Sequence, residues 1–361
     1  MDLRTKLIFA FVATSLASMF VLGAFSYGES AAALRSASAQ QLESLAAARA
    51  RDLSTIAEAL REQVGLIQSR TNLRAQVAAY AEDPAGARPV IQRIIDDAEQ
   101  SAGIVTRITV YDARGGVIAR SGADHVPYRL LGTLERGEGA RTRYYERPDR
   151  SLATVMEAPL TLDGRVVGRI ASELAVGSFV DLAGSYVGLG ETGEMLLPME
   201  LTPGLVTFLN PLRHTESDSL VVLPLDEASL PVRMALDGVE GVVQDVLDYR
   251  GVPVWAAVRT LTDPPVGLVV KVDAAEELAP VAELRRRLIR VGLAVAALAI
   301  LAGSLVGTLM ARRLRRLNDV VRMVRDGEDG LRASEAGEDE VSFLAESFNR
   351  LMDHMQDRTP R

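Results

Sequence analysis

Two long uncharged segments constrain this chain more than any other feature of its sequence. The first, residues 7–25, reads LIFAFVATSLASMFVLGAF, and the second, residues 291–310, reads VGLAVAALAILAGSLVGTLM. Each is close to the roughly 20 apolar residues that a helix needs to cross a lipid bilayer. Basic residues precede the first segment, and an arginine cluster begins at Arg312 after the second. We therefore predict two transmembrane helices, over residues 7–27 and 291–310.

Other interpretations of these segments stay open. The first could be a cleaved signal peptide, although the apolar core of such a peptide is only about 7–15 residues long. Either segment could also be the core helix of a soluble protein. Because basic residues are enriched in cytoplasmic loops, residues 1–6 and the chain after Arg312 are expected in the cytoplasm. Tyr27 to about Arg287 then lies outside, with Arg285 to Arg287 extending toward the membrane interface.

Composition excludes several classes of protein. With 361 residues the chain can form two or three modules of ordinary size. Its net charge of -8 argues against a nucleic-acid partner. It has no cysteine, and His125, His214 and His354 are isolated, so we expect no disulfide, no metal site and no cofactor. Neither a glycine-rich phosphate loop nor a Gly-x-Ser-x-Gly elbow occurs, so no catalytic residues are predicted.

The region after the first apolar segment, residues 28–102, is expected to be a helical stalk. Apolar residues at helical spacing form a stripe along one face. Such a stripe can pack on its own domain or on the same helix of a second chain, and we expect both in part. The stripe consists of Leu42, Leu45, Ala46, Leu53, Ile56, Leu60, Val64 and Ile67.

Strand patterns follow the stalk twice, which predicts an α+β fold with two antiparallel-sheet modules, residues 103–184 and 185–273. The first module has one hairpin turning at residues 112–116 and a second turning at Asp163-Gly164, a pair that favours tight hairpins. A strand is expected at residues 141–145 between them. In the second module we predict that residues 194–197 pair with 205–209, and that 242–249, 252–261 and 266–272 form a meander. Residues 274–290 form a helical link.

Four segments of the second module resemble membrane-proximal sensor segments of bacterial histidine kinases and cyclases. They are GETGEMLL at Gly190, FLNPLR at Phe208, DYRGVPVWAAVR at Asp248 and GLVVKVD at Gly267. The whole region resembles a double-Cache sensor, in which each module is PAS-like, as in chemoreceptors. The resemblance implies a multi-pass protein of the bacterial cytoplasmic membrane. It also implies a small-molecule ligand in the membrane-distal module, under a loop from about Ser121 to Arg141. Pro265-Val266 departs from the pattern, which implies a remodelled or unused proximal pocket.

Residues 141–144 are similar to the strand with which amino-acid-binding members hold their ligand, but Arg143 replaces the tryptophan. Arg143 and Tyr145 share one strand face, so both can reach a carboxylate-bearing ligand such as an amino acid. Alternatively, these groups satisfy one another on a solvated face. The candidate ligand-binding residues are Tyr111, Arg120, Arg141, Arg143, Tyr145 and Glu157.

Residues 311–358 carry two apolar seams at coiled-coil spacing, separated by a polar, glycine-rich stretch that begins at Gly327. Neither helix can bury its seam alone, so we predict a parallel four-helix bundle formed by a homodimer. A generic coiled-coil linker is the alternative. The first seam is Leu314, Leu317, Val321 and Val324, and the second is Val341, Leu344, Phe348, Leu351 and Met355.

This layout resembles a HAMP domain, with Gly327 at the start of the connector, Leu331 within it, and Glu340 at the head of the second helix. Two departures are the missing proline of the first helix and Ser342 at a position usually held by glycine. The resemblance implies that ligand binding shifts the bundle between two packings and signals to a cytoplasmic output module or partner outside this chain. Two alternatives stay open: the input half of a histidine kinase or nucleotide cyclase, and a membrane-anchored binding protein without signalling.

Overall fold

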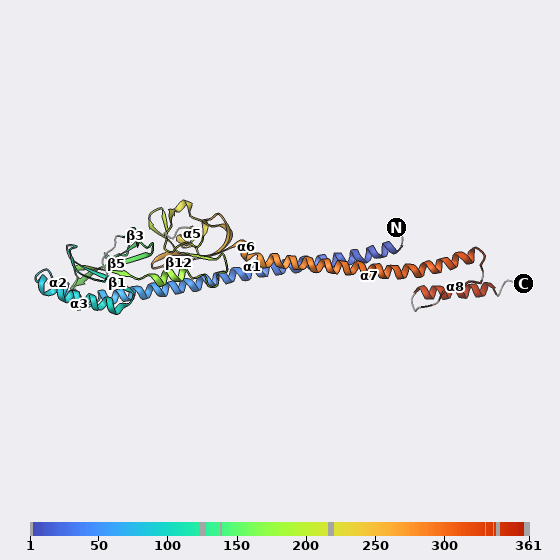
Figure 1. Ribbon diagram of the computed structural model, residues 1–361, viewed down its shortest axis with the longest axis horizontal. Coiled ribbons are helices and arrows are strands. Elements are labelled where there is room, and N and C mark those ends of the chain that lie inside the picture. Colours follow the sequence, from blue (N-terminus) through green and yellow to red (C-terminus); the bar gives the residue numbers. More distant parts are fainter. Residues whose placement is uncertain are drawn as a thin grey trace. The chain divides into compact units, whose positions relative to one another are not determined.

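The computed structural model describes residues 3–122, 128–137, 139–215, 220–328, 330–334, 336 and 340–356. The chain divides into two compact units, Leu34–Ala279 and Met1–Ala33 with Pro280–Arg361, and each is described here by itself. Figure 1 shows the elements of both. The predicted α+β class with antiparallel sheets and a long helix is confirmed.

The stalk is a helical layer formed by α1 (Leu3–Gln68), α2 (Thr71–Ala79) and α3 (Pro84–Ala102). The predicted stripe of α1 packs on its own unit, because Ala46 and Leu53 are completely buried in the hydrophobic core. The side chain of Asp83 accepts a hydrogen bond of 3.0 Å from Gly86 N, and Pro84 occupies the first turn, so the start of α3 is fixed by its sequence.

The distal module is a six-stranded antiparallel sheet in the order β2-β1-β6-β5-β4-β3. Ile108, Val110 and Ile170 are completely buried on the face that α3 helps to cover. The neighbouring residues of these strands point to the opposite face, since side chains alternate along a strand. The strands are β1 (Val105–Asp112), β2 (Val117–Gly122), β3 (Arg129–Glu135), β4 (Arg141–Glu146), β5 (Leu152–Leu162) and β6 (Arg165–Leu174).

Both predicted hairpins of this module are confirmed, and the second turns at Asp163 and Gly164 with φ of 48° and 73°. The predicted loop over the sheet is partly wrong. Residues 129–135 form β3, which pairs with β4 so that Leu130 lies opposite Tyr145. Pairing with an edge strand provides hydrogen-bond partners for the backbone of this stretch. Residues 123–127, the part of the predicted loop that includes His125, lie outside the described residues.

The proximal module has a four-stranded sheet, β11-β12-β13-β7, and a three-stranded sheet, β10-β9-β8. The predicted meander β11-β12-β13 is confirmed. The predicted pairing of residues 194–197 with 205–209 is largely wrong: β7 pairs with β13, while β9 pairs with β8 and β10, although Leu197 O accepts a hydrogen bond of 3.0 Å from Leu209 N. The chain forms an additional strand, β8, directly before β9, and this nearer strand takes its place as the partner. The strands are β7 (Glu194–Leu196), β8 (Pro198–Thr202), β9 (Leu205–Phe208), β10 (Val222–Pro224), β11 (Gly241–Leu247), β12 (Pro253–Thr262) and β13 (Pro265–Asp273).

Short helices complete this unit, and one hydrophobic core runs through both modules. Ile108 of the distal sheet and Trp255 of the proximal sheet belong to the same buried cluster. A second, smaller cluster lies between the proximal sheet and α5, where Val232 and Val269 are buried. The helices are α4 (Gly177–Ala183), η1 (Leu225–Glu227), α5 (Leu230–Leu236) and α6 (Ala274–Glu277).

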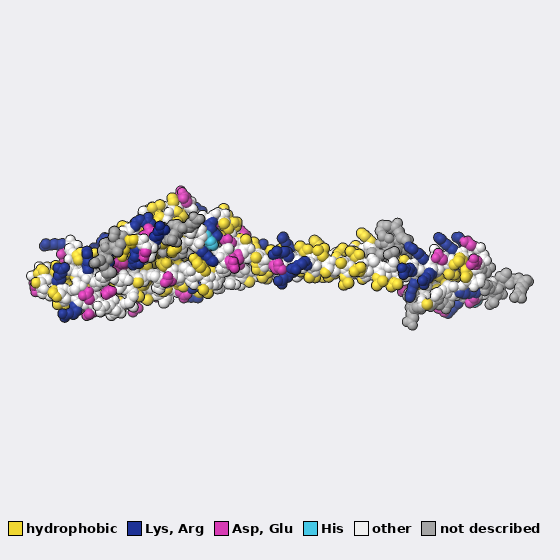
Figure 2. Space-filling view, viewed as in Figure 1, with side chains coloured by type: hydrophobic (Ala, Val, Ile, Leu, Met, Phe, Trp, Pro, Cys, Tyr) yellow, Lys and Arg dark blue, Asp and Glu magenta, His cyan; other side chains and the backbone are white. Residues whose placement is uncertain are grey.

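The other unit contains the helix α7 (Ala279–Arg325). Within the described residues, one helical stretch, Ala274–Arg325, is long and apolar enough to cross a membrane by length and composition. Its apolar side chains are exposed, as at Leu298 and Leu301, and Figure 2 shows them as a hydrophobic stretch bounded by basic clusters. The predicted span at residues 7–27 lies in α1, where Phe20 and Phe25 are exposed, and it stays a prediction.

The C-terminal helix α8 (Glu340–Gln356) follows α7 after a short connector. The predicted break is confirmed, since α7 ends at Arg325 and Gly327 has a φ of 109°, which favours glycine. In Figure 1, α8 runs in the same direction as the end of α7. Side chains of both helices, including Leu317 and Val341, line a common groove.

Candidate functional site

A cavity of about 110 Å³ lies on the face of the distal sheet that points away from α3. Four strands and the residue that precedes β3 provide its walls. Polar and aromatic groups dominate the lining, and it contains basic and acidic side chains in equal number. The lining residues are Arg107, Thr109, Tyr111, Tyr128, Arg143, Tyr145, Val155, Glu157, Ala171 and Glu173.

Glu173 is one of the two carboxylates of this cavity, and it is only 5% exposed. It accepts hydrogen bonds from Arg147 Nη2 at 2.9 Å and from the hydroxyl of Tyr128 at 3.1 Å. Arg107 Nη1 lies 3.7 Å from its other oxygen. A buried carboxylate requires such partners, because leaving it unpaired costs several kcal/mol. Burial lowers the pKa of Arg147, but its hydrogen bond and charge interaction with Glu173 outweigh that effect and raise it above the ordinary value.

Glu157 is the second carboxylate, and it is 7% exposed. Arg141 Nε donates to its Oε2 atom at 2.6 Å, and Arg143 Nη1 forms an ion pair with Oε1. The two arginines lie on the same face of β4, whose side chains alternate between half-buried and buried positions. Arg143 and Glu157 therefore pair with each other, as the second interpretation of the sequence expected, and their role in ligand binding stays a prediction.

Aromatic rings form another part of the cavity wall. The rings of Tyr128 and Tyr145 lie 6.1 Å apart at 57°, a tilted arrangement that aromatic pairs favour. The guanidinium group of Arg147 lies 5.8 Å from the centre of the Tyr128 ring. Tyr128 is thus held by a hydrogen bond at one end and by stacking contacts on its ring.

Four of the six predicted ligand-binding residues line the cavity: Tyr111, Arg143, Tyr145 and Glu157. Arg141 pairs with Glu157 but is not part of the lining. Arg120 lies on β2, where its backbone oxygen accepts a hydrogen bond of 2.6 Å from Gln92, and it is not part of the lining either. Their roles in ligand binding stay predictions.

Sequence reasoning missed Arg107, Tyr128 and Glu173. For Arg107 a signal existed, since it alternates with Thr109 and Tyr111 along β1 and so shares their face. For Glu173 the same alternation with Ala171 was available on β6. Tyr128 lies beside a segment outside the described residues, and no local pattern indicates that its ring turns toward the sheet.

The proximal module contains charges of similar type that are packed against one another. Lys271 is 1% exposed, and its Nζ atom lies 2.9 Å from Glu194 and 2.6 Å from Asp248. The hydroxyl of Tyr249 donates to Glu194 at 2.9 Å, and Lys271 lies 4.7 Å from the Tyr249 ring centre. These groups satisfy each other in a closed cluster.

The pKa values of this cluster reflect that closure. Burial raises the pKa of Asp248, but hydrogen bonding and charge from Lys271 and Arg250 outweigh it and hold the pKa below its ordinary value. Burial, together with the charge of Glu194, raises the pKa of Tyr249 far above its ordinary value. Among the described residues, no group of three or more His, Asp or Glu could hold a metal ion.

In the C-terminal segment, Asn349 ties α8 to the connector. Its side-chain amide accepts a hydrogen bond from Ala333 N and donates one to Ala333 O, both of 2.8 Å. Arg332 Nη2 adds an ion pair of 2.6 Å with Asp353. The buried positions of α8 are Ser342, Ala345, Asn349 and Met352.

The predicted seam of α8 is a different face. Leu344, Leu351 and Met355 are 54%, 59% and 59% exposed, whereas Val341 and Phe348 are half-buried. On α7, Val321 is exposed, and Leu314, Leu317 and Val324 are half-buried. Leu331 of the connector is half-buried, and Glu340 is exposed at the start of α8. Two apolar stripes are thus left incompletely covered within one chain.

Comparison with known families decides the identity of this segment. Residues 305–357 match the HAMP domain. The match agrees with the predicted domain at residues 311–358 and begins within the apolar stretch of α7. None of the curated proteins matches the chain.

Solved structures similar to this chain are sensory or ligand-binding domains. The periplasmic sensory domain of the Campylobacter jejuni chemoreceptor Tlp1 is 12% identical over 68% of this chain and 99% of its own, with a TM-score of 0.47. The ligand-binding domain of Mlp24 with asparagine is 14% identical over 71% and 99%, with a TM-score of 0.46. That of the Pseudomonas aeruginosa PAO1 amino acid chemoreceptor PctC, in complex with GABA, is 15% identical over 65% and 98%, with a TM-score of 0.39.

Proposed function

We propose that this chain is the input part of a homodimeric bacterial membrane receptor that senses a small amino acid outside the cell and signals through its HAMP domain to a cytoplasmic output module. The carrying observation is that one chain combines a cavity lined by paired charges and tyrosines with a HAMP domain that follows a membrane-length helix. The ligand, the dimer and the first membrane span are parts of this proposal.

The charges of the distal cavity support an amino-acid ligand. Among the described residues, Arg143 pairs only with Glu157 through Nη1, so its remaining N–H groups can bind a ligand carboxylate. Glu157 and Glu173 offer carboxylates to an ammonium group, and the faces of Tyr128 and Tyr145 attract cations. A volume of about 110 Å³ limits the ligand to a small molecule.

Ligand titration of the purified full chain in lipid nanodiscs tests this assignment. We expect small amino acids to raise the melting temperature, and simple carboxylates or amines to raise it less, because each satisfies only half of the site. Arg143→Gln should weaken binding at least about tenfold, the equivalent of about 1.4 kcal/mol, since a charge-assisted hydrogen bond is lost.

Arg141→Gln is the matched control, because Arg141 shares the strand face and the partner of Arg143 but does not line the cavity. The ligand affinity of this variant should stay within about twofold of the wild-type affinity. That change is much smaller than the tenfold loss, or about 1.4 kcal/mol, expected for Arg143→Gln. Equal losses in both variants would contradict the assigned site. No response to any amino acid would contradict the ligand class.

The exposed seam of α8 supports the homodimer. An apolar stripe that is left uncovered within one chain is expected to pack on another, and a second copy supplies two more helices with the same seams. Because the chain has no cysteine, single cysteines can be introduced without interference. We expect Leu344→Cys to crosslink between chains in membranes, and the buried neighbour Ala345→Cys to crosslink several-fold less.

The same test on the first helix compares Leu317→Cys with Asn318→Cys, of which the former should crosslink more. Equal yields within each pair would contradict a parallel bundle. An enzyme input half, such as that of a histidine kinase or nucleotide cyclase, is distinguished by an in-frame catalytic domain after residue 361. Phe348→Ala would leave downstream responses intact only if the chain were a binding protein without signalling.

A further inference from the structure

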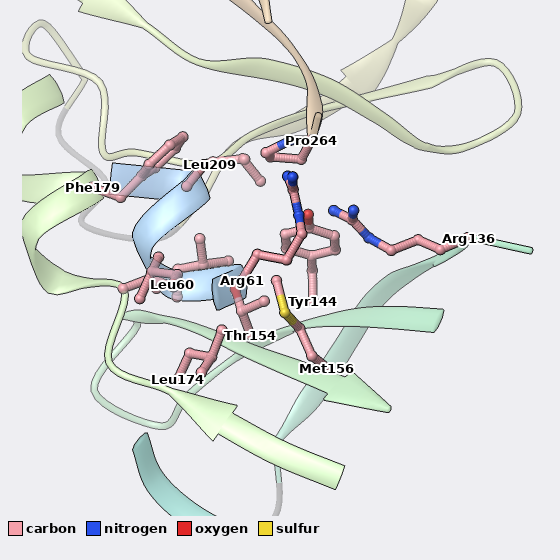
Figure 3. Close-up of a pocket in the computed structure, with 13 residues that line it drawn as sticks. Leu60, Arg61, Arg136, Tyr144, Thr154, Met156, Leu174, Phe179, Leu209 and Pro264 are labelled. Atoms are coloured by element: carbon pink, nitrogen blue, oxygen red, sulfur yellow. The ribbon is translucent and has the colours of Figure 1, made fainter. Parts of the chain in front are cut away.

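A second, smaller cavity lies on the opposite face of the distal sheet from the ligand cavity. It is about 40 Å³ in volume and is bordered by α1, the distal strands and the proximal module. Most of its lining is apolar, including Leu60, Leu174 and Phe179. Figure 3 shows its lining residues. The polar members come from separate parts of the unit: Arg61 from α1, Arg136 from the turn after β3, Tyr144 from β4 and Thr154 from β5.

Hydrogen-bond donors converge on this cavity. In Figure 3 the guanidinium groups of Arg61 and Arg136 lie next to the hydroxyl of Tyr144. Within the part of the chain that the structure describes, Arg61 Nε, Arg136 Nη2 and Thr154 Oγ1 are buried and have no hydrogen-bond partner. Thr154 is only 4% exposed. Buried polar atoms without partners are rare in folded proteins, and an ordered water or a bound ion would satisfy them.

One carboxylate, that of Asp263, serves both arginines. Arg61 Nη2 lies 2.8 Å from its Oδ2 atom and also donates to the Asp263 backbone oxygen at 3.0 Å, while Arg136 Nη1 pairs with Oδ1. The lining of the cavity includes no acidic residue. Two guanidinium groups and one carboxylate leave a formal charge of +1.

Tyr144 keeps its proton and can therefore donate. Burial raises its pKa to about 12, although the charge of Arg136 acts in the opposite direction. The cavity thus presents a cationic pair, a protonated phenol and a threonine hydroxyl, all of which can donate. A bound cation needs hydrogen-bond acceptors or negative charges around it. An anion, in contrast, is stabilised by each of these donors.

We propose that this cavity binds one small monovalent anion of the halide class, with chloride as its ordinary occupant. The volume has room for more than the roughly 10–15 Å³ that one water needs but is too small for an amino acid with its side chain. A single negative charge balances the formal +1. The side chain of Arg136 is 19% exposed and that of Arg61 is 40% exposed, so an anion would interact most strongly with Arg136, where water screens the charge less.

The anion would lie where the stalk, the distal sheet and the proximal module meet. Arg61 belongs to the stalk, Arg136 and Tyr144 belong to the distal module, and Asp263 belongs to the β12–β13 turn of the proximal module. Binding of the anion therefore stabilises this three-way contact, and by mass action it stabilises the folded unit. The inference concerns a site separate from the ligand cavity and does not depend on the proposed function.

Anion-dependent thermal unfolding of the full chain in nanodiscs tests the proposal. Chloride, bromide and nitrate are compared with gluconate and sulfate at constant ionic strength, and unfolding is followed by the fluorescence of Trp255, the single tryptophan of the chain. At 150 mM we expect each of the small anions to raise the melting temperature by about 2–6 °C relative to gluconate, because a ligand that binds only the folded state adds to its stability.

Arg136→Gln and Thr154→Val should remove or strongly reduce this shift. Thr154→Val is nearly isosteric and retains both arginines, so it decides the question if Arg136→Gln does not fold. Arg259→Gln is the matched control: Arg259 also connects α1 to the proximal module, 3.1 Å from Glu43, but it does not line the cavity. This variant should keep the full shift in melting temperature.

Two outcomes would overturn the proposal. Equal melting temperatures in all five anions would mean that only water occupies the cavity, and an unchanged shift in Thr154→Val would place the anion elsewhere.

Discussion

The two sensor modules carry similar charged and aromatic residues on comparable sheet faces, yet one face is hollow and the other is filled. In the distal module, Arg143, Glu157 and Glu173 surround a cavity. In the proximal module, Lys271, Glu194 and Asp248 contact one another directly and are each at most 6% exposed. The same chemistry therefore produces a candidate ligand site in one module and a structural core in the other.

The two sites differ in the basic residue at their centre, although Arg250 also pairs with Asp248 in the proximal cluster. A single Lys271 ammonium at the centre of the proximal cluster reaches two carboxylates at once. In the distal module, four arginines pair with the two carboxylates, and a cavity lies beside these pairs. A lysine acts as a compact point charge, whereas the planar guanidinium group is a fork that matches the geometry of a carboxylate. Whether Pro265-Val266 reflects a remodelled or an unused proximal pocket stays a prediction.

The largest expected effect is on stability in the proximal module. Lys271→Met leaves Glu194 and Asp248 buried without their shared cation, and we expect a loss of about 3–5 kcal/mol in the free energy of unfolding. Denaturant titration followed by Trp255 fluorescence measures it. Arg143→Met in the distal module should cost clearly less than Lys271→Met, because the buried Glu157 keeps Arg141 as a partner and Arg143 itself is 28% exposed. Equal costs would remove the distinction between a filled and a hollow module.

A pair of tyrosine variants sharpens the same contrast at smaller magnitude. Tyr249→Phe removes the hydroxyl that donates to buried Glu194, which should cost about 1–2 kcal/mol of stability and leave ligand affinity unchanged. Tyr128→Phe removes the hydroxyl that donates to Glu173 at the cavity wall. We expect it to weaken ligand binding several-fold with a smaller change in stability. Calorimetric titration of both variants measures ligand affinity, and thermal unfolding measures their stability. A loss of stability without a change of affinity in Tyr128→Phe would contradict the expected contrast.

Local patterns predicted most of the fold, whereas contacts between distant segments escaped them. The turn at Asp163-Gly164 and the helix break at Gly327 follow from residues adjacent in sequence, and both are confirmed. The partner of β7 is β13, more than seventy residues further along the chain by its numbering, and no local pattern identifies it. Alternation on β4 correctly placed Arg143 and Tyr145 on one face.

The same limit applies to the candidate site. The alternation of side chains along a strand assigns a residue to one face of the sheet. It does not say whether a cavity lies on that face. Glu194 and Glu173 are both acidic residues in apolar strands, and only their neighbours distinguish a buried cluster from a cavity wall. The missed residues Arg107 and Tyr128 are part of the cavity wall. Their role depends on strands and segments that meet only in the fold.

The smallest expected effect is the pH dependence of the proximal cluster. The pKa of Asp248 is lower in the folded chain than its ordinary value of 3.8, because the hydrogen bond and charge of Lys271, with those of Arg250, outweigh burial. Its contribution to stability is therefore complete above the unfolded pKa and is lost as the pH falls from about 4 through the folded pKa. Melting temperatures between pH 5.5 and 3 should fall less steeply in Asp248→Asn than in the wild type. Asp237→Asn, which removes an exposed carboxylate of the same module, should follow the wild type. Identical slopes in all three proteins would show that the cluster takes up no additional proton on unfolding, and the ion pairs of the filled module would then contribute nothing to its stability in acid.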